Sequence, residues 1–385
     1  MRILTVANHL GARGGLERTQ LTNCRALAAR GHRVDLVYQS EGNFADDWRA
    51  FTGTMTKVRG TLPRRSAPLS STAGVLAGLR TARRAAADVV YVYRYWDVPF
   101  AVATAARTGA SVVFHLCLPP PRVTPAWLRP FLARVDATLA VSADTARRWQ
   151  GSGLRAEATR VVLTGIDLAT YAPGWPAARA ATRGELGLTE NAFVVLYAGR
   201  LGREKGVDVL VRAFAALVER VRDAHLVVIG SASLGADPGD SERYLRELHA
   251  VADGLPVTWM PARQDVVPLI QAADVAVVPS LWPEPLARAV MEPLACGVPV
   301  VASRVGGNPE ILSDWLATYL FEPGDAAGLA DLLCGLDGWR AREPQLGARC
   351  REVAVTRLAL DHEVDEIEKA FEEVAARRGQ AASRP

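Results

Sequence analysis

Short apolar segments alternate with segments of helical periodicity along nearly the whole chain, and this alternation constrains the fold more than any other feature. Such alternation is typical of βαβ units, which build doubly wound parallel sheets. The first series begins with an expected strand at Ile3–Ala7 and a glycine-led helix at Gly14–Ala29. The further strands expected in this series are Val34–Tyr38, Val89–Tyr93, Val112–Leu116, Ala137–Val141 and Val161–Leu163.

The alternation stops near Tyr171 and restarts at Val194. Proline and glycine cluster in the stretch between them, so we predict a linker at 172–190. The strands expected in the second series are Val194–Tyr197, Leu226–Ile229, Val257–Trp259, Val275–Val278 and Val298–Ala302.

We therefore expect two Rossmann-like domains, at 1–171 and 191–359, facing a central cleft that is the default ligand site. A long amphipathic helix is expected at Leu358–Arg378. Residues from about 360 to 385 are predicted to cross back and complete the first domain.

The composition of the 385 residues is that of an ordinary globular protein, with 22% charged residues and a net charge of +4. This mild basicity suits small anionic ligands and argues against nucleic acid as a partner. Five cysteines, without metal-type spacing, are typical of reduced thiols in a cytoplasmic protein. The apolar start is too short for a signal peptide, and no apolar run is long enough to span a membrane.

Two glutamates, Glu284 and Glu292, lie between the strands expected at Val275–Val278 and Val298–Ala302. A loop that follows a strand is where an α/β protein presents polar groups to a ligand. Carboxylates accept hydrogen bonds and repel phosphate. If the pair forms a site, it binds hydroxyl groups, and cations for an anionic ligand must come from elsewhere.

Two cations, Arg200 and Lys205, occupy a glycine-bracketed loop between a strand and a helix expected from Val207. The helix N-terminus attracts anions as well, so the segment favours diphosphate binding. The chain has only three lysines but 42 arginines. Because lysine is a compact point charge, its rarity points to a specific role for Lys205.

Taken together, Gly199–Gly206, Pro279–Ala302 and Gly306–Glu310 resemble, in order and spacing, the retaining nucleotide-sugar glycosyltransferases of family 4, also called group 1. The resemblance covers the second half of the chain and implies the two-domain GT-B fold. The first half is similar to the family more loosely, at Gly14-Gly15-Leu16-Glu17, at His115, at Val141-Ser142 and at Thr164–Asp167.

The resemblance implies a role for each motif residue in binding a nucleotide-sugar donor. Arg200 and Lys205 would hold the diphosphate and stabilise the charge that develops as the sugar–phosphate bond breaks. Glu292 would accept hydrogen bonds from the ribose, and Glu284 from the transferred hexose. The further residues expected at the donor are Gly14, Gly15, Gly199 and Met260, together with the backbone amides of Leu286, Ala287 and Arg288.

His115 ends an expected strand and should point into the cleft from the opposite wall, where the resemblance implies contact with the transferred sugar. For the acceptor we expect His9 at the end of the first strand, and Arg94 beside Trp96 after the third. A lone histidine at a strand end is more often structural, and the aromatic residues beside Arg94 equally suit packing.

The resemblance also implies transfer with retention, in which the leaving phosphate oxygen helps to remove the acceptor's proton. No Asp-x-Asp motif is present to hold a divalent cation, so we expect metal-independent chemistry without a cofactor. The donor is expected to be UDP-linked. The acceptor is a sugar, a cyclitol, a glycan or a natural-product precursor.

The sequence departs from the family pattern at three places. Ala287 and Arg288 replace residues that are usually glycine and apolar, so the Arg288 side chain is within reach of the donor. Pro293 directly follows Glu292, so the helix there either begins late or bends. Met260 and the proline after it replace a usual glycine in a loop that touches the nucleobase in relatives, which leaves the base open.

Three alternatives remain at this stage. An epimerase or a catalyst that couples a cyclitol uses the same fold, and a non-catalytic binding protein is an alternative of another class. Membrane docking is possible but not favoured, because the most basic stretch has few large apolar residues. That stretch comprises Lys57, Arg59, Arg64, Arg65, Arg80, Arg83 and Arg84.

Overall fold

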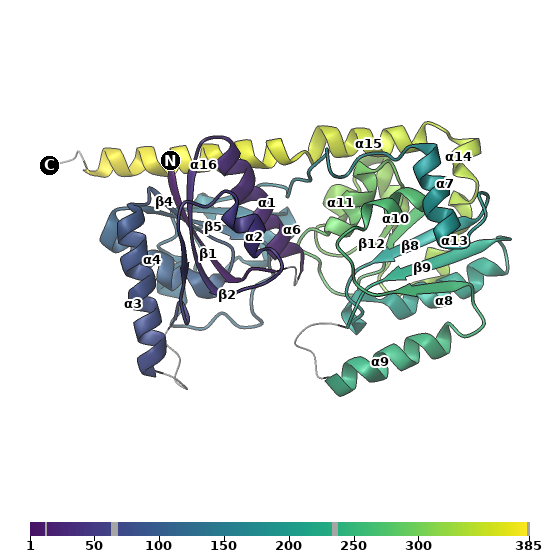
Figure 1. Cartoon of the computed structure of the whole chain (residues 1–385), viewed down its shortest axis with the longest axis horizontal. Helices are drawn as coiled ribbons and strands as arrows, with labels where there is room; N and C mark the ends of the chain where they lie inside the picture. Colours follow the sequence, from purple (N-terminus) through teal and green to yellow (C-terminus); the bar gives the residue numbers. More distant parts are fainter. Residues whose placement is uncertain (12–13, 63–67, 233–237, 383–385) are drawn as a thin grey trace. The chain divides into compact units, whose positions relative to one another are not determined.

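The computed structural model describes residues 1–11, 14–62, 68–232 and 238–382. The chain divides into two compact units (Figure 1). Unit 1 comprises Met1–Gly165 together with Leu360–Pro385, and unit 2 comprises Ile166–Ala359. The C-terminal segment therefore belongs to the first unit, which confirms the predicted return of the last helix.

Unit 1 is built on a seven-stranded sheet of order β3-β2-β1-β4-β5-β6-β7, in which every pair is parallel. The chain runs outward from β1 in one direction and then returns to continue from β4 in the other. The point between β1 and β4 is therefore a topological switch point, where such sheets bind ligands. The strands are β1 (Arg2–His9), β2 (Arg33–Ser40), β3 (Met55–Lys57), β4 (Val89–Val92), β5 (Ser111–Leu116), β6 (Ala137–Ala140) and β7 (Thr159–Val161).

Helices cover both faces of this sheet (Figure 1). One apolar cluster packs α1 (Gly15–Ala29) and α16 (Leu360–Ala382) on one face, through Leu27 and Phe371 among others. A second cluster includes residues of α3 (Pro68–Ala85) and α4 (Val98–Thr108). The shorter helices of the unit are α2 (Ala45–Arg49), α5 (Arg129–Leu132) and α6 (Ala143–Arg148).

Unit 2 contains a six-stranded parallel sheet of order β10-β9-β8-β11-β12-β13. Its switch point lies between β8 and β11. The strands are β8 (Phe193–Ala198), β9 (Ala224–Ile229), β10 (Val257–Met260), β11 (Val275–Val278), β12 (Val300–Ser303) and β13 (Leu320–Phe321). Its helices are α7 (Pro176–Glu185), α8 (Val207–Val218), α9 (Pro238–Val251), α10 (Val267–Ala272), α11 (Arg288–Ala295), α12 (Asn308–Ile311), α13 (Ala326–Leu336), α14 (Trp339–Arg342) and α15 (Leu346–Arg357). Two Rossmann-like parallel-sheet units confirm the predicted fold class.

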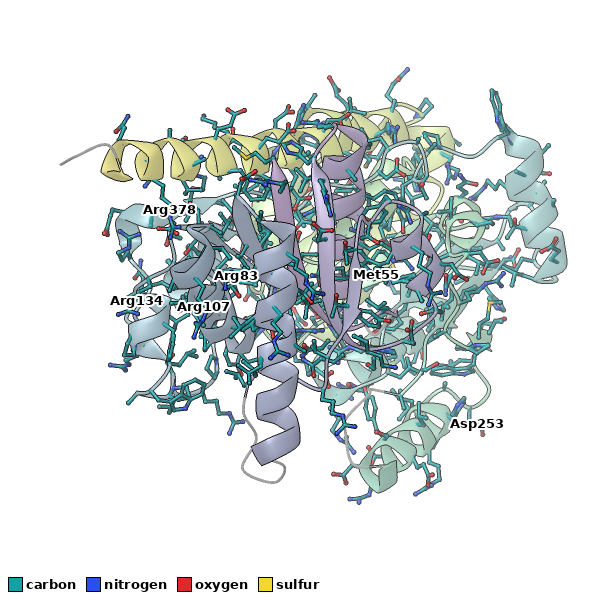
Figure 2. The ribbon with its side chains drawn as sticks, turned by 60° about the vertical axis from the view of Figure 1, so that its left-hand side comes forward. Met55, Arg83, Arg107, Arg134, Asp253 and Arg378 are labelled. Atoms are coloured by element: carbon teal, nitrogen blue, oxygen red, sulfur yellow. The ribbon has the colours of Figure 1, made fainter. Side chains whose placement is uncertain are left out.

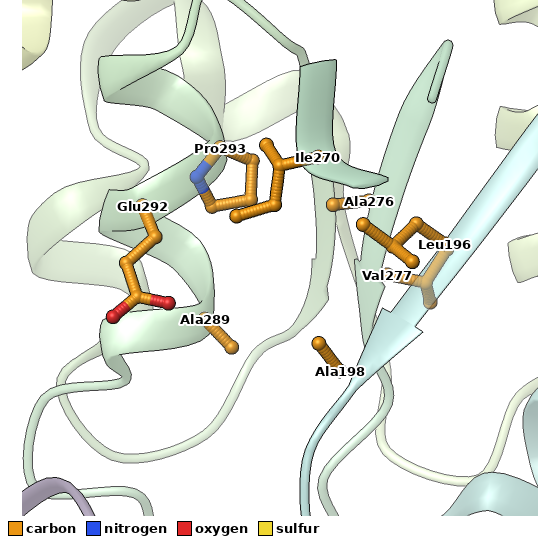
Figure 3. Close-up of a pocket in the computed structure, with 8 residues that line it drawn as sticks. All are labelled: Leu196, Ala198, Ile270, Ala276, Val277, Ala289, Glu292 and Pro293. Carbon is orange, nitrogen blue, oxygen red and sulfur yellow. The ribbon is translucent and has the colours of Figure 1, made fainter. Parts of the chain in front are cut away.

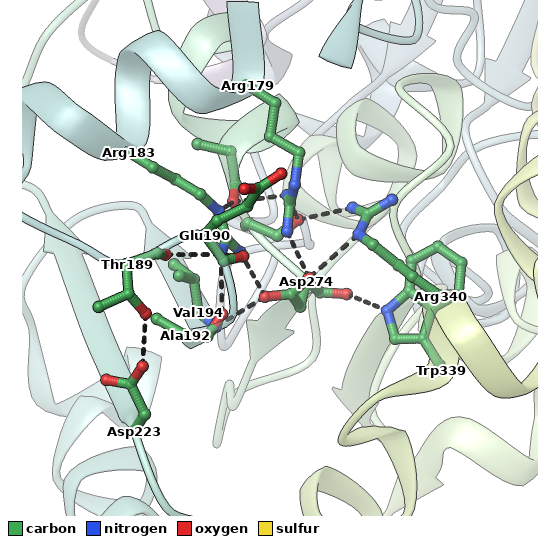
Figure 4. Close-up of polar contacts among 12 residues, drawn as sticks. Arg179, Arg183, Thr189, Glu190, Ala192, Val194, Asp223, Asp274, Trp339 and Arg340 are labelled. Carbon is green, nitrogen blue, oxygen red and sulfur yellow. Dashed lines mark hydrogen bonds and ion pairs between the residues drawn. The ribbon is translucent and has the colours of Figure 1, made fainter. Parts of the chain in front are cut away.

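The segment 172–190, expected to be a linker, contains helix α7 and packs into unit 2. Arg179 and Arg183, one turn apart on this helix, both donate to the carboxylate of Asp274 at 2.6 Å (Figure 4). Arg340 of α14 donates to the same carboxylate at 3.0 Å. The segment is thus anchored to unit 2, because two of its arginines, together with Arg340, bind the acidic residue that precedes β11.

Candidate functional site

The carboxyl ends of β8 and β11 meet at the switch point of unit 2, and their loops are interlocked. The loop after β8 contains a short 3-10 turn at Arg203–Lys205 and leads into α8. The amide of Leu281 donates to the carbonyl of Glu204 at 2.9 Å. Gly206 has φ +64°, and a Cβ there would lie 2.1 Å from the carbonyl oxygen of Pro279. Only glycine allows the two loops to approach this closely.

This approach brings Lys205 and Glu284 into direct contact. The Lys205 ammonium lies 2.5 Å from Glu284 Oε1, and the Ser280 hydroxyl donates to the same oxygen at 2.6 Å. The ammonium also lies 5.3 Å from the ring centroid of Trp282. The side chains of Lys205 and Glu284 are 16% and 9% exposed, so this ion pair is largely withdrawn from water.

A third loop, after β12, fixes the backbone of Glu284. The amide of Gly307 donates to the Glu284 carbonyl at 2.8 Å. Gly306 has φ +56°, and a Cβ there would lie 1.9 Å from the same carbonyl oxygen. The predicted Gly306-Gly307 pair therefore has a physical role, which is to let this loop hold Glu284 in place.

Arg200 lies in the loop after β8 but takes no part in the contact between Lys205 and Glu284. Its carbonyl accepts a hydrogen bond from the Tyr197 hydroxyl at 2.6 Å, and its guanidinium lies 3.8 Å from Glu204. Its side chain is 40% exposed, so it is available to a ligand. Gly199 precedes it and donates its amide to Ile229 at 3.0 Å.

Helix α11 begins at Arg288, with Ala287 as its N-cap residue and no side-chain cap. The amides of Leu286 and Ala287 therefore precede the helix, and that of Arg288 opens it. The first amides of a helix have no partner within it, so this end can accept an anion. Pro293 lies inside the helix, so the helix does not begin late.

Glu292 projects from α11 and lines a pocket between this helix and the strands β8 and β11 (Figure 3). It is the one charged residue among those that line the pocket, which are Leu196, Ala198, Ile270, Ala276, Val277, Ala289, Glu292 and Pro293. Its Oε1 accepts a hydrogen bond from Nε of Arg288 at 3.1 Å.

Met260 ends β10, at the far edge of the sheet from β11. Its carbonyl accepts a hydrogen bond from the amide of Gly230 at 3.0 Å. It does not join the contacts of Lys205 and Glu284.

His115 in unit 1 does not present its imidazole to an open site. Its side chain is fully buried, and its Nδ1 lies 2.5 Å from the Tyr91 hydroxyl. Its Nε2 faces Glu363 of α16 at 3.7 Å. Burial lowers the pKa of His115 to about 3, so the ring is neutral. The imidazole is therefore enclosed within unit 1 beside Glu363 of α16, and its contact with the transferred sugar stays a prediction.

The other residues predicted in unit 1 lie near the carboxyl ends of β1 and β4, but they do not form one cluster. Arg94 donates to Glu17 of α1 at 2.5 Å, and both side chains are 11% exposed. The guanidinium of Arg94 also lies 5.7 Å from the ring centroid of Trp96. Gly14 has an extended backbone and Gly15 opens α1, so the Arg94–Glu17 ion pair connects the first turn of α1 to the segment that follows β4. His9 lies apart from this pair, with its Nδ1 3.1 Å from the hydroxyl of Ser40.

Sequence reasoning missed three side chains that contact the predicted residues. Ser280 and Trp282 lie shortly before Glu284, and their places within the quoted motif are the signal that could have found them. Glu363 lies far along the chain from His115, and no local pattern in the sequence marks their contact.

The basic stretch considered for membrane docking is only partly described. Arg64 and Arg65 lie outside the described residues. Arg83 on α3 is exposed, as are Arg107 on α4 and Arg134 beyond α5, all on unit 1 (Figure 2). Across the described ranges, no helix combines the length and apolar character needed to cross a membrane. Within those ranges, no three His, Cys, Asp or Glu side chains group as metal ligands would.

Comparison with known families gives a match in each half of the chain. Residues 178–334 match the sequence model of the glycosyl transferases group 1, and residues 13–170 match that of glycosyltransferase family 4.

Curated relatives are similar over part of their length. Spore coat protein SA of Bacillus subtilis is 35% identical over 170 residues, which cover 42% of this chain and 44% of that protein. A D-inositol 3-phosphate glycosyltransferase of Xylanimonas cellulosilytica is 35% identical over 264 residues, covering 64% and 60%. The chain thus spans about half the length of these relatives.

Among solved structures, Anabaena HepE in complex with UDP and glucose has a TM-score of 0.82 and 21% identity, covering 97% of this chain and 99% of that one. At this identity the likeness establishes the fold.

Proposed function

This chain belongs to the group 1 (family 4) glycosyltransferases, and on that premise we propose that it moves a hexose from a nucleotide sugar to an acceptor hydroxyl. The donor we propose is UDP-linked, and the transfer retains the anomeric configuration without a metal ion. The observation that carries the proposal is the Lys205–Glu284 contact at the switch point of unit 2. It joins a cation suited to a diphosphate and a carboxylate suited to sugar hydroxyls.

Each part of the donor has a partner in unit 2. Lys205 and the exposed Arg200 bind the diphosphate, assisted by the free amides at the start of α11. As the sugar–phosphate bond breaks, negative charge grows on the leaving phosphate, and these fixed cations stabilise it. Glu284 accepts hydrogen bonds from the hexose, and Glu292 from the ribose.

The choice of donor and acceptor draws on the relatives. HepE was solved with UDP-glucose as well as with UDP and glucose. Several relatives carry the name D-inositol 3-phosphate glycosyltransferase. We therefore propose a UDP-hexose as donor and a small polyol or cyclitol as the first acceptor class to test.

The experiment has two stages. Thermal unfolding is followed with a panel of nucleoside diphosphates and their sugar conjugates, because a ligand that binds only the folded state raises its stability. UDP release is then measured with and without each acceptor, and the anomeric configuration of the product is read by NMR. Release that needs an acceptor supports transfer, and release without any acceptor supports a hydrolase. Conversion of the nucleotide sugar into an isomer without net UDP release supports an epimerase.

Lys205→Met tests the site itself. Losing one fixed donor to a developing oxyanion typically costs about 100- to 1,000-fold in rate. Arg203→Met is the matched control, because Arg203 is a neighbouring cation that pairs with Glu247 on the surface. Transfer at the wild-type rate by the Lys205 variant would contradict the proposal.

A further inference from the structure

Arg288 occupies a position that the stability of its own helix does not explain. It is the first residue of α11, where the helix dipole disfavours a cation. Its partner Glu292 follows four residues later, and an arginine placed before a glutamate is the weaker order for such a pair. An ordinary surface helix would gain little from this arrangement.

The Arg288–Glu292 pair is also withdrawn from solvent. The two side chains are 12% and 14% exposed. Nη1 of Arg288 is buried and has no hydrogen-bond partner among the described residues. Burial lowers the pKa of Arg288, but Glu292 and Tyr171 outweigh burial and raise it, so the group stays charged. A buried ion pair with an unsatisfied donor is a weak source of stability.

The two carboxylate oxygens of Glu292 differ in their contacts. Oε1 accepts the hydrogen bond from Nε of Arg288 at 3.1 Å. Among the described residues, no side-chain donor contacts Oε2. One oxygen is thus held in place while the other keeps its capacity to accept hydrogen bonds beside the pocket that Glu292 lines.

The same arrangement holds Glu284, whose Oε1 takes both the Lys205 and the Ser280 contacts. Each of the two carboxylates is therefore anchored through a single oxygen and paired with one cation. Pairing also offsets the repulsion that a bare carboxylate would exert on a nearby diphosphate.

We propose that Arg288 is a positioning residue for the donor's ribose, because its Nε–H holds Oε1 of Glu292 and leaves Oε2 to accept hydrogen bonds from the ribose hydroxyls. This inference rests on the proposed function. It assigns the side chain of Arg288 a role separate from that of its backbone amide.

The test compares the binding of UDP and 2′-deoxy-UDP by calorimetry. A hydrogen bond to a charged group contributes about 1.5–3 kcal/mol, so the wild-type protein should prefer UDP by roughly ten- to a hundredfold. In Arg288→Leu we expect this preference to fall to within about threefold, because Glu292 is no longer held. If the leucine variant does not fold, Arg288→Met serves the same purpose.

Arg288→Gln separates positioning from charge. Nε2 of glutamine lies as many bonds from the backbone as Nε of arginine, so it can donate to Glu292 without a positive charge. We expect it to restore the preference for UDP to within about threefold of wild type. Arg246→Leu is the control, because Arg246 lies near Glu242 in the same i, i+4 spacing on the exposed α9.

Two results would overturn the inference while leaving the proposed function intact. One is an unchanged preference for UDP in Arg288→Leu, and the other is a loss in Arg288→Gln as large as in the leucine variant. If the wild-type protein binds no nucleoside diphosphate, the proposed function fails and the inference fails with it.

Discussion

The ammonium of Lys205 lies 2.5 Å from Oε1 of Glu284, although the two residues are 79 positions apart in the chain. Before a donor binds, Lys205, which we propose binds the diphosphate, and Glu284, which we propose binds the sugar, thus neutralise each other's charge. Binding of a nucleotide sugar would place a phosphate near Lys205 and hydroxyl groups near Glu284. The ion pair therefore keeps both side chains in position in the absence of a ligand.

Glu284→Gln should separate the nucleotide from the sugar. UDP lacks the hexose, so we expect its affinity to stay within about threefold of wild type. The rate of transfer from a UDP-hexose should fall about 10- to 100-fold, because a charge-assisted hydrogen bond to the sugar is lost. Calorimetry with UDP and turnover with the sugar nucleotide measure the two effects. An equal loss in both would place Glu284 at the nucleotide instead.

Gly306→Ala should reduce both stability and transfer. Its Cβ would meet the carbonyl oxygen of Glu284 at 1.9 Å, so the backbone of Glu284 must move. We expect a rate loss of at least about tenfold, because small displacements of positioning groups have large effects on rate.

Gly254→Ala is the matched control for this substitution. Gly254 has a similar positive φ of +73°, but no atom lies within 4 Å of its added Cβ. It should cost about 1 kcal/mol of stability through backbone strain and leave turnover unchanged. Equal effects of the two substitutions would show that strain, and not the position of Glu284, is responsible.

The burial of His115 predicts a pH dependence of stability in unit 1. Its folded pKa of about 3 lies below the ordinary value of 6.5. Between these values the unfolded chain binds a proton that the folded chain does not, so the free energy of unfolding falls as pH falls below 6.5. The slope is about 1.4 kcal/mol per pH unit from this one group.

His115→Gln should remove that contribution while keeping a polar partner for Tyr91. Hydrogen exchange of the β5 amides between pH 6 and 4 reports the opening of this unit. We expect protection to decline less steeply in the variant than in wild type. Parallel profiles would mean that the imidazole takes up its proton within the folded state.

Asp274→Ala should destabilise unit 2 strongly. Asp274 accepts hydrogen bonds from Arg179, Arg183 and Arg340, so its loss leaves buried cations without a carboxylate (Figure 4). Breaking a buried ion pair costs about 3–5 kcal/mol. Asp331→Ala, which removes an exposed partner of Arg220, should have a much smaller effect, because solvent screens an exposed ion pair. Urea unfolding of both variants measures the difference.

The sequence was sufficient to predict the two sheets and the loops that bear Lys205 and Glu284. Apolar strands and glycine-bracketed loops are local signals, and the rarity of lysine marked one of the two residues. The contact between them was not predictable, because it depends on the close approach of two loops at Gly206 and Pro279.

Two further contacts were not predictable for the same physical reason. The position of His115 at a strand end was predicted correctly, but its covering residue, Glu363, comes from the last helix. Proline and glycine near 172–190 suggested a linker, whereas the i, i+4 pair of Arg179 and Arg183 binds an acidic residue about 90 positions later. Local patterns identify elements well, and they do not identify partners that are distant in sequence.

The return of α16 to unit 1 has a consequence for the order of synthesis. Unit 2 is one uninterrupted segment, Ile166–Ala359, whereas unit 1 needs Leu360 onward to cover the apolar face that Val364, Ile367 and Phe371 fill. During synthesis, unit 2 can therefore finish folding before unit 1, because one face of the unit 1 sheet stays uncovered until α16 has been made. The core of unit 1 therefore joins residues from both sides of unit 2 in the sequence, and its apolar face is covered only after unit 2 has been made.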